Sequence, residues 1–180
     1  KNRTFGNILG HAKNVNDLSS MVKWTHDQFD QGLSWSYIVW IRKIWNGPII
    51  LKGILDLEDA KIASKMGIEG IIVSNHGGRQ LDGTMSSILA LEKITNLFGD
   101  KFDIYFDGGI RSGQDVLKAM GLGAKGTMIG RPYLYGLGAL GEEGVSLCLD
   151  IIKRELDLSM ALCGHVNICL LYTSDAADEE

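Results

Sequence analysis

Apolar and polar positions change their spacing along the chain, and each change predicts a different kind of element. Up to residue 45, apolar side chains recur at helical spacing and predict helices over 17–29 and 36–45, the second capped by Ser34. Beyond Asn46-Gly47, short continuous apolar runs predict strands that are buried on both faces. The expected strands are 48–51, 70–74, 104–107 and 126–129, and helical spacing follows them at 57–66, 86–98, 113–120 and, in segments, up to residue 162. The last segment is expected to share one apolar face, made of Val145, Leu149, Ile152, Leu156 and Met160.

The order of strand, loop and helix, repeated four times, predicts a parallel α/β fold. No predicted strand is followed by the G-x-G-x-x-G spacing of a dinucleotide-binding sheet. The third and fourth strands are instead followed by glycine and arginine, in DGGIRSG at 107–113 and IGRPYLYG at 129–136. TIM barrels often bind phosphate after their last two strands, so we interpret the four strands as about strands 5 to 8 of a (β/α)8 TIM barrel, with other α/β sheets left open. Since a complete barrel takes roughly 250 residues, we expect its C-terminal half here.

Composition and charge exclude several classes of function. Of the 22 acidic and 18 basic residues, four acidic ones lie in 169–180, which leaves residues 1–168 with balanced charge. Gross charge therefore offers no case for binding nucleic acid or acidic lipid. Cys148, Cys163 and Cys169 show neither a disulfide framework nor zinc-ligand spacing, so no metal is expected and a reducing compartment is favoured. No stretch approaches the roughly 18 apolar residues of a membrane-spanning helix.

A histidine and an arginine follow the second predicted strand, in SNHGGRQLDG at 74–83. His76 comes between a buried strand and two glycines, where it can be held rigidly yet exposed, as a general base requires. Arg79 could clamp a carboxylate with two hydrogen bonds. A loop histidine with only local hydrogen bonds is the alternative. Lys52 ends the first strand, where it could stabilise an anionic ring or enolate, or simply extend into solvent.

Charged residues after the third and fourth strands suit a sugar phosphate. Asp107 could bind a ribityl or sugar hydroxyl, or could cap its own tight turn. Glycine-freed backbone amides and guanidinium groups suit a phosphate monoester, and Arg111 and Arg131 are placed alike after their strands. We therefore favour phosphate binding over surface ion pairs for both arginines. The four tryptophans, at 24, 35, 40 and 45, are interpreted as packing residues.

These motifs resemble the FMN-dependent 2-hydroxy acid dehydrogenase and oxidase family. The run SNHGGRQLDG at 74–83 is highly specific to it, and LKGI at 51–54, DGGIRSGQDVLKA at 107–119 and GRPYLYGLGALGEEGV at 130–145 agree with it. The segments SW at 34–35, WI at 40–41 and WNGPIILKG at 45–53 are most similar to the respiratory L-lactate dehydrogenase branch. The resemblance covers about residues 1–165.

The resemblance implies a TIM barrel with FMN at its C-terminal mouth and the oxidation of an L-2-hydroxy acid, with L-lactate to pyruvate as the first candidate. By this resemblance, His76 takes a proton from the substrate and Arg79 binds the substrate carboxylate. Lys52 would lie beside the flavin N1 and O2, and Ser74 would be a further flavin contact. The ribityl chain and phosphate would be bound by Asp107, Gly108, Gly109, Arg111, Gly130 and Arg131.

Partners and location follow from the same resemblance. The substrate would be a small 2-hydroxy acid, and the electron acceptor is left open among a quinone, a cytochrome and oxygen. A homo-oligomer is expected, because the family commonly forms tetramers. The expected location is cytoplasmic, or peripheral on the inner face of the cell membrane.

The extent of the chain leads to further expectations. Residues 1–168 are expected to be the C-terminal half of the barrel, inactive without the first half. Cys169–Glu179 resembles a translated transposase sequencing adapter, so residues 169–180 are expected to be an artefact. Two alternatives stay open. One is another phosphate-binding barrel, similar to IMP dehydrogenase or a flavin-dependent isomerase, which would need neither His76 nor Arg79. The other is a non-catalytic remnant that binds only flavin or phosphate.

Overall fold

The computed structural model describes residue 8, residues 10–168 and residue 171. The chain divides into two units, Lys1–Gly47 and Pro48–Glu180, which are described separately. Residues 169–180 were expected to be an artefact, and apart from residue 171 they lie outside the described residues. No helix among the described residues is long and apolar enough to cross a membrane.

The first unit contains the two helices α1 (Leu18–Asp27) and α2 (Trp35–Ile44). α1 begins at a capping box, in which Asp17 and Ser20 each satisfy the other's backbone amide. Ser34 does stand at the N-cap of α2, but its hydroxyl bonds Ser36 instead of a backbone amide. Of the tryptophans interpreted as packing residues, Trp40 and Trp45 are 56% and 53% exposed, and the Trp45 ring lies against Gly47.

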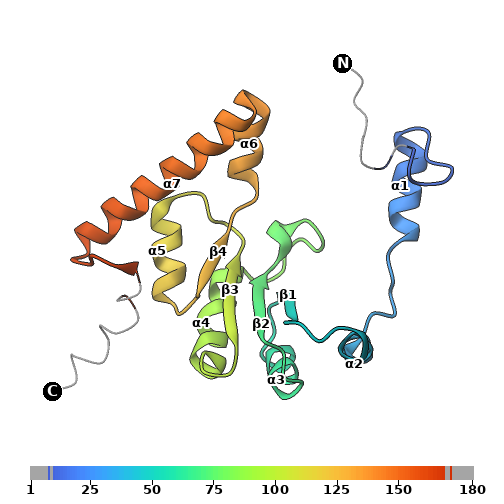
Figure 1. The fold of residues 1–180 in the computed structure, drawn as a ribbon, viewed down its shortest axis with the longest axis horizontal. Coiled ribbons are helices and arrows are strands. Elements are labelled where there is room, and N and C mark those ends of the chain that lie inside the picture. Colours follow the sequence, from blue (N-terminus) through green and yellow to red (C-terminus); the bar gives the residue numbers. More distant parts are fainter. Residues whose placement is uncertain (1–7, 9, 169–170, 172–180) are drawn as a thin grey trace. The chain divides into compact units, whose positions relative to one another are not determined.

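Four parallel strands form the sheet of the second unit, in the order β1-β2-β3-β4 (Figure 1). They are β1 (Ile50–Ile54), β2 (Gly70–Ser74), β3 (Asp103–Asp107) and β4 (Gly126–Met128). The first strand was expected at 48–51 and starts later, because the Ile49 amide donates to the Glu69 carboxylate instead of a neighbouring strand. β2 is buried as expected, whereas Ile50 on β1 and Met128 on β4 are about half exposed, since these are the edge strands.

Helices α3 (Leu57–Lys65) and α4 (Ser87–Phe98) follow the first two strands and cover part of the sheet. Asp56 caps α3 by accepting the Glu58 amide, and Gly67, with φ of 66°, follows its end as expected. α4 buries positions spaced three and four residues apart, which is the pattern of a helix with one packed face: Ser87, Ala90, Leu91, Ile94 and Thr95. The core lies between this face and the buried side chains of β2 and β3, which are Ile71, Val73, Ile104 and Phe106.

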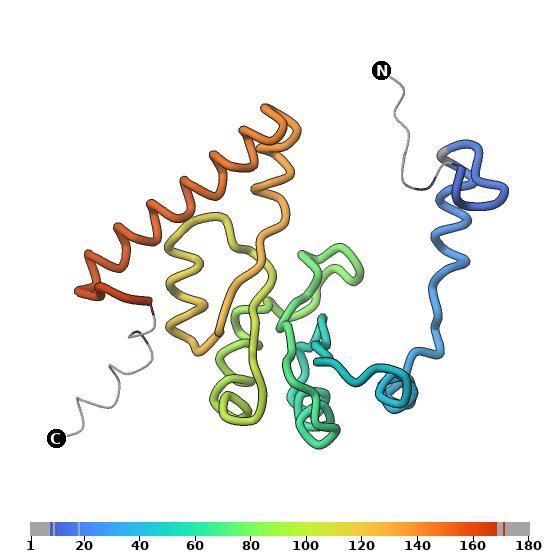
Figure 2. The backbone as a smooth tube through the Cα atoms, viewed as in Figure 1, coloured from blue at the N-terminus to red at the C-terminus, as the bar shows by residue number. Residues whose placement is uncertain are grey.

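The last three helices are α5 (Gly113–Gly121), α6 (Arg131–Leu140) and α7 (Glu142–Leu162), and α7 runs along both α5 and α6 (Figures 1 and 2). Close approach between helices depends on glycine here, because a Cβ on Gly136 would collide with the Gly144 backbone. The expected stripe on α7 is right except at Leu149, which is 51% exposed. Cys148 is the half-buried residue at that turn.

Candidate active site

Three polar side chains meet near the C-terminal edge of the sheet, and we call Lys52, Ser74 and Asp107 the strand-end cluster. Lys52 was expected to end the first strand, but β1 runs on to Ile54, so this lysine lies in the middle of its strand. Ser74 and Asp107 are the last residues of β2 and β3 and are register partners, which brings them together. Lys52 Nζ donates to Ser74 Oγ at 2.9 Å and to Asp107 Oδ2 at 2.7 Å, and Ser74 Oγ donates to the same carboxylate at 2.6 Å. A bulge between Lys52 and Ile54, with Gly53 at φ of 98°, shifts the register of β1 next to this lysine.

The strand-end cluster keeps an ionised carboxylate next to a lysine. Burial alone raises the pKa of Asp107, but hydrogen bonds from Lys52 and Ser74, together with the charges of Lys52 and His76, outweigh it. The pKa of Asp107 therefore lies below its ordinary value of 3.8. Ser74 is 1% exposed, while the side chains of Lys52 and Asp107 are 36% and 19% exposed, so the pair is open to solvent from the lysine side.

His76 lies directly beyond this cluster, in a turn with a left-handed backbone that we call the His76 turn (His76–Gly78). The φ angles of His76, Gly77 and Gly78 are 54°, 66° and 73°. Glycine adopts such angles without a steric penalty, whereas histidine pays about 1–2 kcal/mol. The His76 amide donates to Ser74 Oγ at 3.0 Å, so the turn is attached to the strand-end cluster. The imidazole is exposed, as a base that must reach a substrate requires.

Arg79, expected at the substrate, and Arg131, one of the two arginines expected at the phosphate, have different surroundings. Arg79 follows the His76 turn, is exposed, and its amide donates to the His76 carbonyl. Arg131, at the start of α6, reaches across from the loop after β4 and donates from Nη2 to the Gly77 carbonyl at 2.7 Å. The structure thus brings Arg131 to the His76 turn, a contact that sequence reasoning did not predict.

The two glycines after β3 differ in how closely other groups pack against them. At Gly108, with φ of 119°, a Cβ would lie 2.5 Å from Ser87 Oγ and 3.2 Å from Asn75 Oδ1. At Gly109, with φ of 85°, no atom lies within 4 Å of the Cβ position. Open backbone at Gly109 suits the approach of a ligand oxygen.

The two expected phosphate loops differ at the helices that follow them. At α5, Asp115 accepts the amides of Arg111 and Ser112, and Glu155 accepts that of Gly113, so these amides are already bonded. At α6, no side chain caps the helix at Gly130, and open space surrounds that glycine. The start of α6 therefore leaves its backbone amides, apart from Pro132 which has none, without a side-chain partner, whereas the exposed Arg111 can contribute its guanidinium group.

Sequence reasoning missed Asn75 and Ser87, both of which contact the predicted site residues. Asn75 Oδ1 accepts the Gly77 amide at 3.0 Å, and Ser87 Oγ donates to the Gly108 carbonyl at 3.5 Å. An asparagine directly before a His-Gly-Gly run is a common turn former, and this signal could have identified Asn75. Ser87 gave no comparable signal, since its role depends on how α4 packs.

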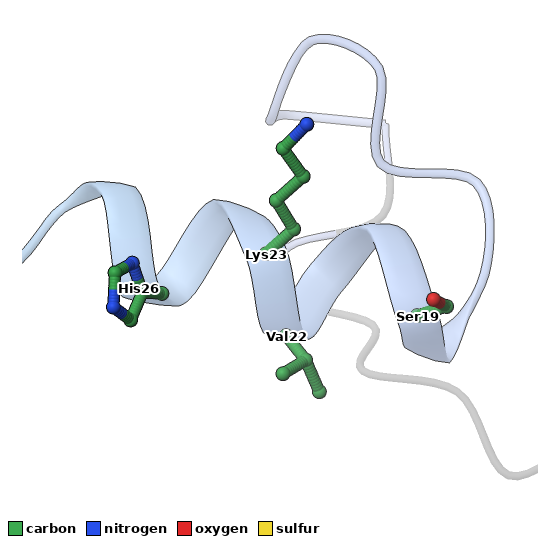
Figure 3. Close-up of a pocket in the computed structure, with 4 residues that line it drawn as sticks. All are labelled: Ser19, Val22, Lys23 and His26. Carbon is green, nitrogen blue, oxygen red and sulfur yellow. The ribbon is translucent and has the colours of Figure 1, made fainter.

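A shallow pocket in the first unit is formed by α1. It is lined by Ser19, Val22, Lys23 and His26, all from α1 (Figure 3). The side chains of Lys23 and Val22 point to opposite sides of the helix in Figure 3. Among the described residues, no group of three or more His, Cys, Asp or Glu side chains could hold a metal ion.

Comparison with known proteins agrees with the resemblance seen in the motifs. The family model of the FMN-dependent dehydrogenases matches residues 2–176. The L-lactate dehydrogenase of Caulobacter vibrioides is 46% identical over 159 residues, which make up 88% of this chain and 42% of that protein. The L-lactate dehydrogenase of Actinobacillus pleuropneumoniae is 45% identical over 168 residues, or 93% of this chain and 44% of that protein.

Solved structures give the same result. A crystal structure of mandelate oxidase with 3,3-difluoro-2-hydroxy-3-phenylpropionic acid has a TM-score of 0.75 and 40% identity, and the match covers 78% of this chain and 43% of that one. A mandelate oxidase variant with a monooxide FMN adduct has a TM-score of 0.74. The chain spans less than half the length of the relatives that it matches. The parallel sheet and these neighbours confirm the predicted fold class, α/β of the TIM-barrel type, and the family match confirms the expected cofactor, FMN. The chain belongs to the FMN-dependent dehydrogenase family.

Proposed function

We propose that the whole protein carrying this chain uses FMN to oxidise an L-2-hydroxy acid to the 2-oxo acid, with L-lactate as its substrate. One observation carries the proposal: the strand-end cluster and the His76 turn form a continuous set of contacts. Ser74 Oγ bonds Lys52 Nζ, the Asp107 carboxylate and the His76 amide, all between 2.6 and 3.0 Å. A cation, a carboxylate and a base are therefore held together at one edge of the sheet, where parallel α/β folds build their sites.

The residues at this edge fit FMN by their chemistry. Arg111 and Arg131 offer guanidinium groups, and the uncapped start of α6 at Gly130 offers backbone amides to a phosphate. The Asp107 carboxylate can accept hydrogen bonds from ribityl hydroxyls, with Gly108 and Gly109 supplying the open backbone beside it. Lys52 would place a positive charge where the isoalloxazine ring gains electrons. Ser74 is the hydroxyl that positions this lysine.

Oxidation of a 2-hydroxy acid removes two electrons and two hydrogens: the hydroxyl loses a proton, and the α-carbon loses its hydrogen together with the bonding electron pair. Bound FMN supplies the two-electron acceptor for this chemistry. The exposed His76 imidazole, in its neutral form, takes the hydroxyl proton. Arg79, at the end of the His76 turn, holds the substrate carboxylate through two parallel hydrogen bonds and so orients the hydroxyl toward His76.

Sequence similarity favours L-lactate over a larger hydroxy acid. The relatives named L-lactate dehydrogenase are 46% and 45% identical to the chain, against 40% for mandelate oxidase. The experiment uses the complete reading frame that contains this chain, purified with FMN and kept anaerobic. L-lactate should bleach the flavin absorbance, while D-lactate should leave it unchanged. Bound flavin that only L-mandelate bleaches would move the substrate to another hydroxy acid, and a folded protein without flavin would overturn the proposal.

Two substitutions test the assigned roles in that protein. Replacing His76 with alanine should lower kcat for L-lactate by at least about 100-fold while flavin stays bound, because general-base catalysis contributes about that much. Replacing Arg79 with alanine should chiefly raise KM. The matched control is Arg154→Ala, since Arg154 is an exposed arginine on α7. Unchanged turnover in His76→Ala would contradict its role as the base.

We further propose that residues 1–180 do not oxidise lactate by themselves. Two edge strands support this: Ile50 on β1 and Met128 on β4 are 47% and 43% exposed, and an uncovered strand edge favours association over a defined site. Detectable L-lactate turnover by the purified 180-residue chain with added FMN would contradict the proposal.

A further inference from the structure

The His76 turn has a backbone conformation that histidine does not prefer. His76, Gly77 and Gly78 all have positive φ, and His76 is the one residue of the three with a side chain that resists it. A strained residue keeps its conformation only where its surroundings determine it. The groups that hold this backbone therefore decide where the imidazole points.

All three amides of the turn are held by the two residues before it. The His76 amide donates to Ser74 Oγ at 3.0 Å, the Gly77 amide to Asn75 Oδ1 at 3.0 Å, and the Gly78 amide to the Asn75 carbonyl at 3.0 Å. Asn75 thus supplies two of the three acceptors, one from its side chain and one from its main chain. The side-chain bond is the part that a substitution can remove.

The same side-chain oxygen also lies against the loop after β3. A Cβ on Gly108 would come within 3.2 Å of Asn75 Oδ1 and within 2.5 Å of Ser87 Oγ, so the Gly108 backbone lies close to both groups. Asn75 is half-buried between the His76 turn and this loop. Its carboxamide therefore connects the segment that carries the base with the segment assigned to the ribityl chain.

We infer that Asn75 is a positioning residue, whose side-chain oxygen holds the His76 turn in its left-handed conformation and so aims the imidazole at the substrate hydroxyl. The inference rests on the proposed function, since it assumes that His76 is the base. Asn75 acts through the backbone of the turn and makes no contact of its own with the substrate. Its loss should therefore lower kcat and leave flavin binding largely unchanged.

The experiment compares three substitutions at this position in the complete FMN-loaded protein. Asn75→Ala removes the acceptor, Asn75→Asp keeps an oxygen at the same place, and Asn75→Gln keeps the amide but moves it by one methylene. With kcat expressed per bound flavin, we expect a loss of about ten-fold or more for alanine and glutamine, because a misplaced base loses most of its benefit. Aspartate should recover kcat to within about three-fold of the original protein. The control is Asn96→Ala, an exposed asparagine on α4, with unchanged kcat.

The deuterium isotope effect on L-lactate labelled at its α-carbon separates positioning from loss of folded protein. Misfolding lowers the flavin content but leaves both kcat per flavin and the isotope effect unchanged, whereas a misplaced base raises the isotope effect as the chemical step becomes slower. Asn75→Ala or Asn75→Gln with kcat per flavin within two-fold of the original would overturn the inference, as would equal losses for Asp and Ala. If alanine prevents folding, the Asp and Gln variants decide the question. Absence of lactate oxidation in the unsubstituted protein would instead overturn the proposed function.

Discussion

Replacing Asp107 with asparagine tests the strand-end cluster directly, because it preserves the shape of the side chain and removes its charge. The carboxylate accepts hydrogen bonds from Lys52 Nζ at 2.7 Å and Ser74 Oγ at 2.6 Å. Its pKa is below the ordinary value of 3.8, since these bonds and the nearby positive charges outweigh the effect of burial, which by itself raises it. The group is therefore ionised at neutral pH, and Lys52 has an anionic partner there.

The expected cost follows from the exposure of each partner. A hydrogen bond to a charged group contributes about 1.5–3 kcal/mol where solvent is excluded. The Lys52 side chain is 36% exposed, so screening reduces its share to about 0.5–1 kcal/mol. Ser74 is buried and can still donate to the asparagine oxygen, so its bond only changes from charge-assisted to neutral, a loss of about 0.5–1 kcal/mol. The free energy of unfolding should fall by about 1–2 kcal/mol at neutral pH.

Urea unfolding of the flavin-free protein measures this difference, and its pH dependence has a defined sign. The pKa of Asp107 is lower in the folded state, so its contribution is fully present above the unfolded pKa, near 3.8, and is lost as pH falls toward the lower folded value. The gap between the original protein and Asp107→Asn should thus be constant from neutral pH to about pH 5 and shrink below about pH 4.

The other end of the same strand provides the control. Asp103 pairs with Lys125, but these side chains are 46% and 57% exposed. Asp103→Asn should therefore lower the free energy of unfolding by at most about 0.5 kcal/mol. Equal stability of Asp107→Asn and the original protein at neutral pH, or equal losses for the two variants, would refute the reasoning.

Three further substitutions test packing and the contacts between loops. Gly113→Ala should lower the free energy of unfolding by at least about 2 kcal/mol, because its Cβ would collide with the α7 backbone. Gly138→Ala, in open space on α6, is the control and should not destabilise the protein. Equal urea midpoints of unfolding for the two variants would contradict this reasoning. Ser74→Ala should lower the free energy of unfolding by about 1–3 kcal/mol and also lower kcat, because the groups bonded to this buried hydroxyl lose a shared partner. Full activity of this variant would argue against the role of the strand-end cluster. Arg131→Met should weaken FMN binding by about ten-fold in a fluorescence titration, against no change for Arg154→Met.

Most elements could be predicted from the sequence, because their signals are local. β2 is a continuous apolar run, and the structure confirms it at Gly70–Ser74, the predicted bounds. The β1 prediction was displaced, since the apolar run begins at Pro48 while the Ile49 amide is taken by a glutamate twenty residues away. Whether an apolar residue forms the hydrogen bonds of a strand depends here on that distant glutamate, and a local pattern of apolar residues carries no information about it. The exposure of Trp40 has the same cause, because helical spacing defines a face but not what covers it.

The strand-end cluster shows how far such prediction reaches into a site. Lys52 and Asp107 are 55 residues apart, yet the sequence placed both at strand ends, and a parallel sheet brings those ends to one edge. Asp107 does end β3, whereas β1 continues for two residues beyond Lys52. Their direct ion pair needed two further facts: the register that sets Ser74 beside Asp107, and the bulge at Gly53 next to the lysine. Register is set by packing over the whole sheet, so the sequence predicted the neighbourhood of these groups but not their bonds.

The loops carry the part of the site that local patterns describe least well. The sequence marked His76 as the candidate base from its glycines, but the direction of its imidazole depends on a left-handed backbone held by Ser74 and Asn75. The Asn75 oxygen in turn lies against Gly108, which arrives from a different loop, after the neighbouring strand β3. A side chain that holds two loops at once has no signature in either one alone. Residues that do chemistry can therefore be found from sequence motifs, whereas residues that aim them emerge only when the loops are seen together.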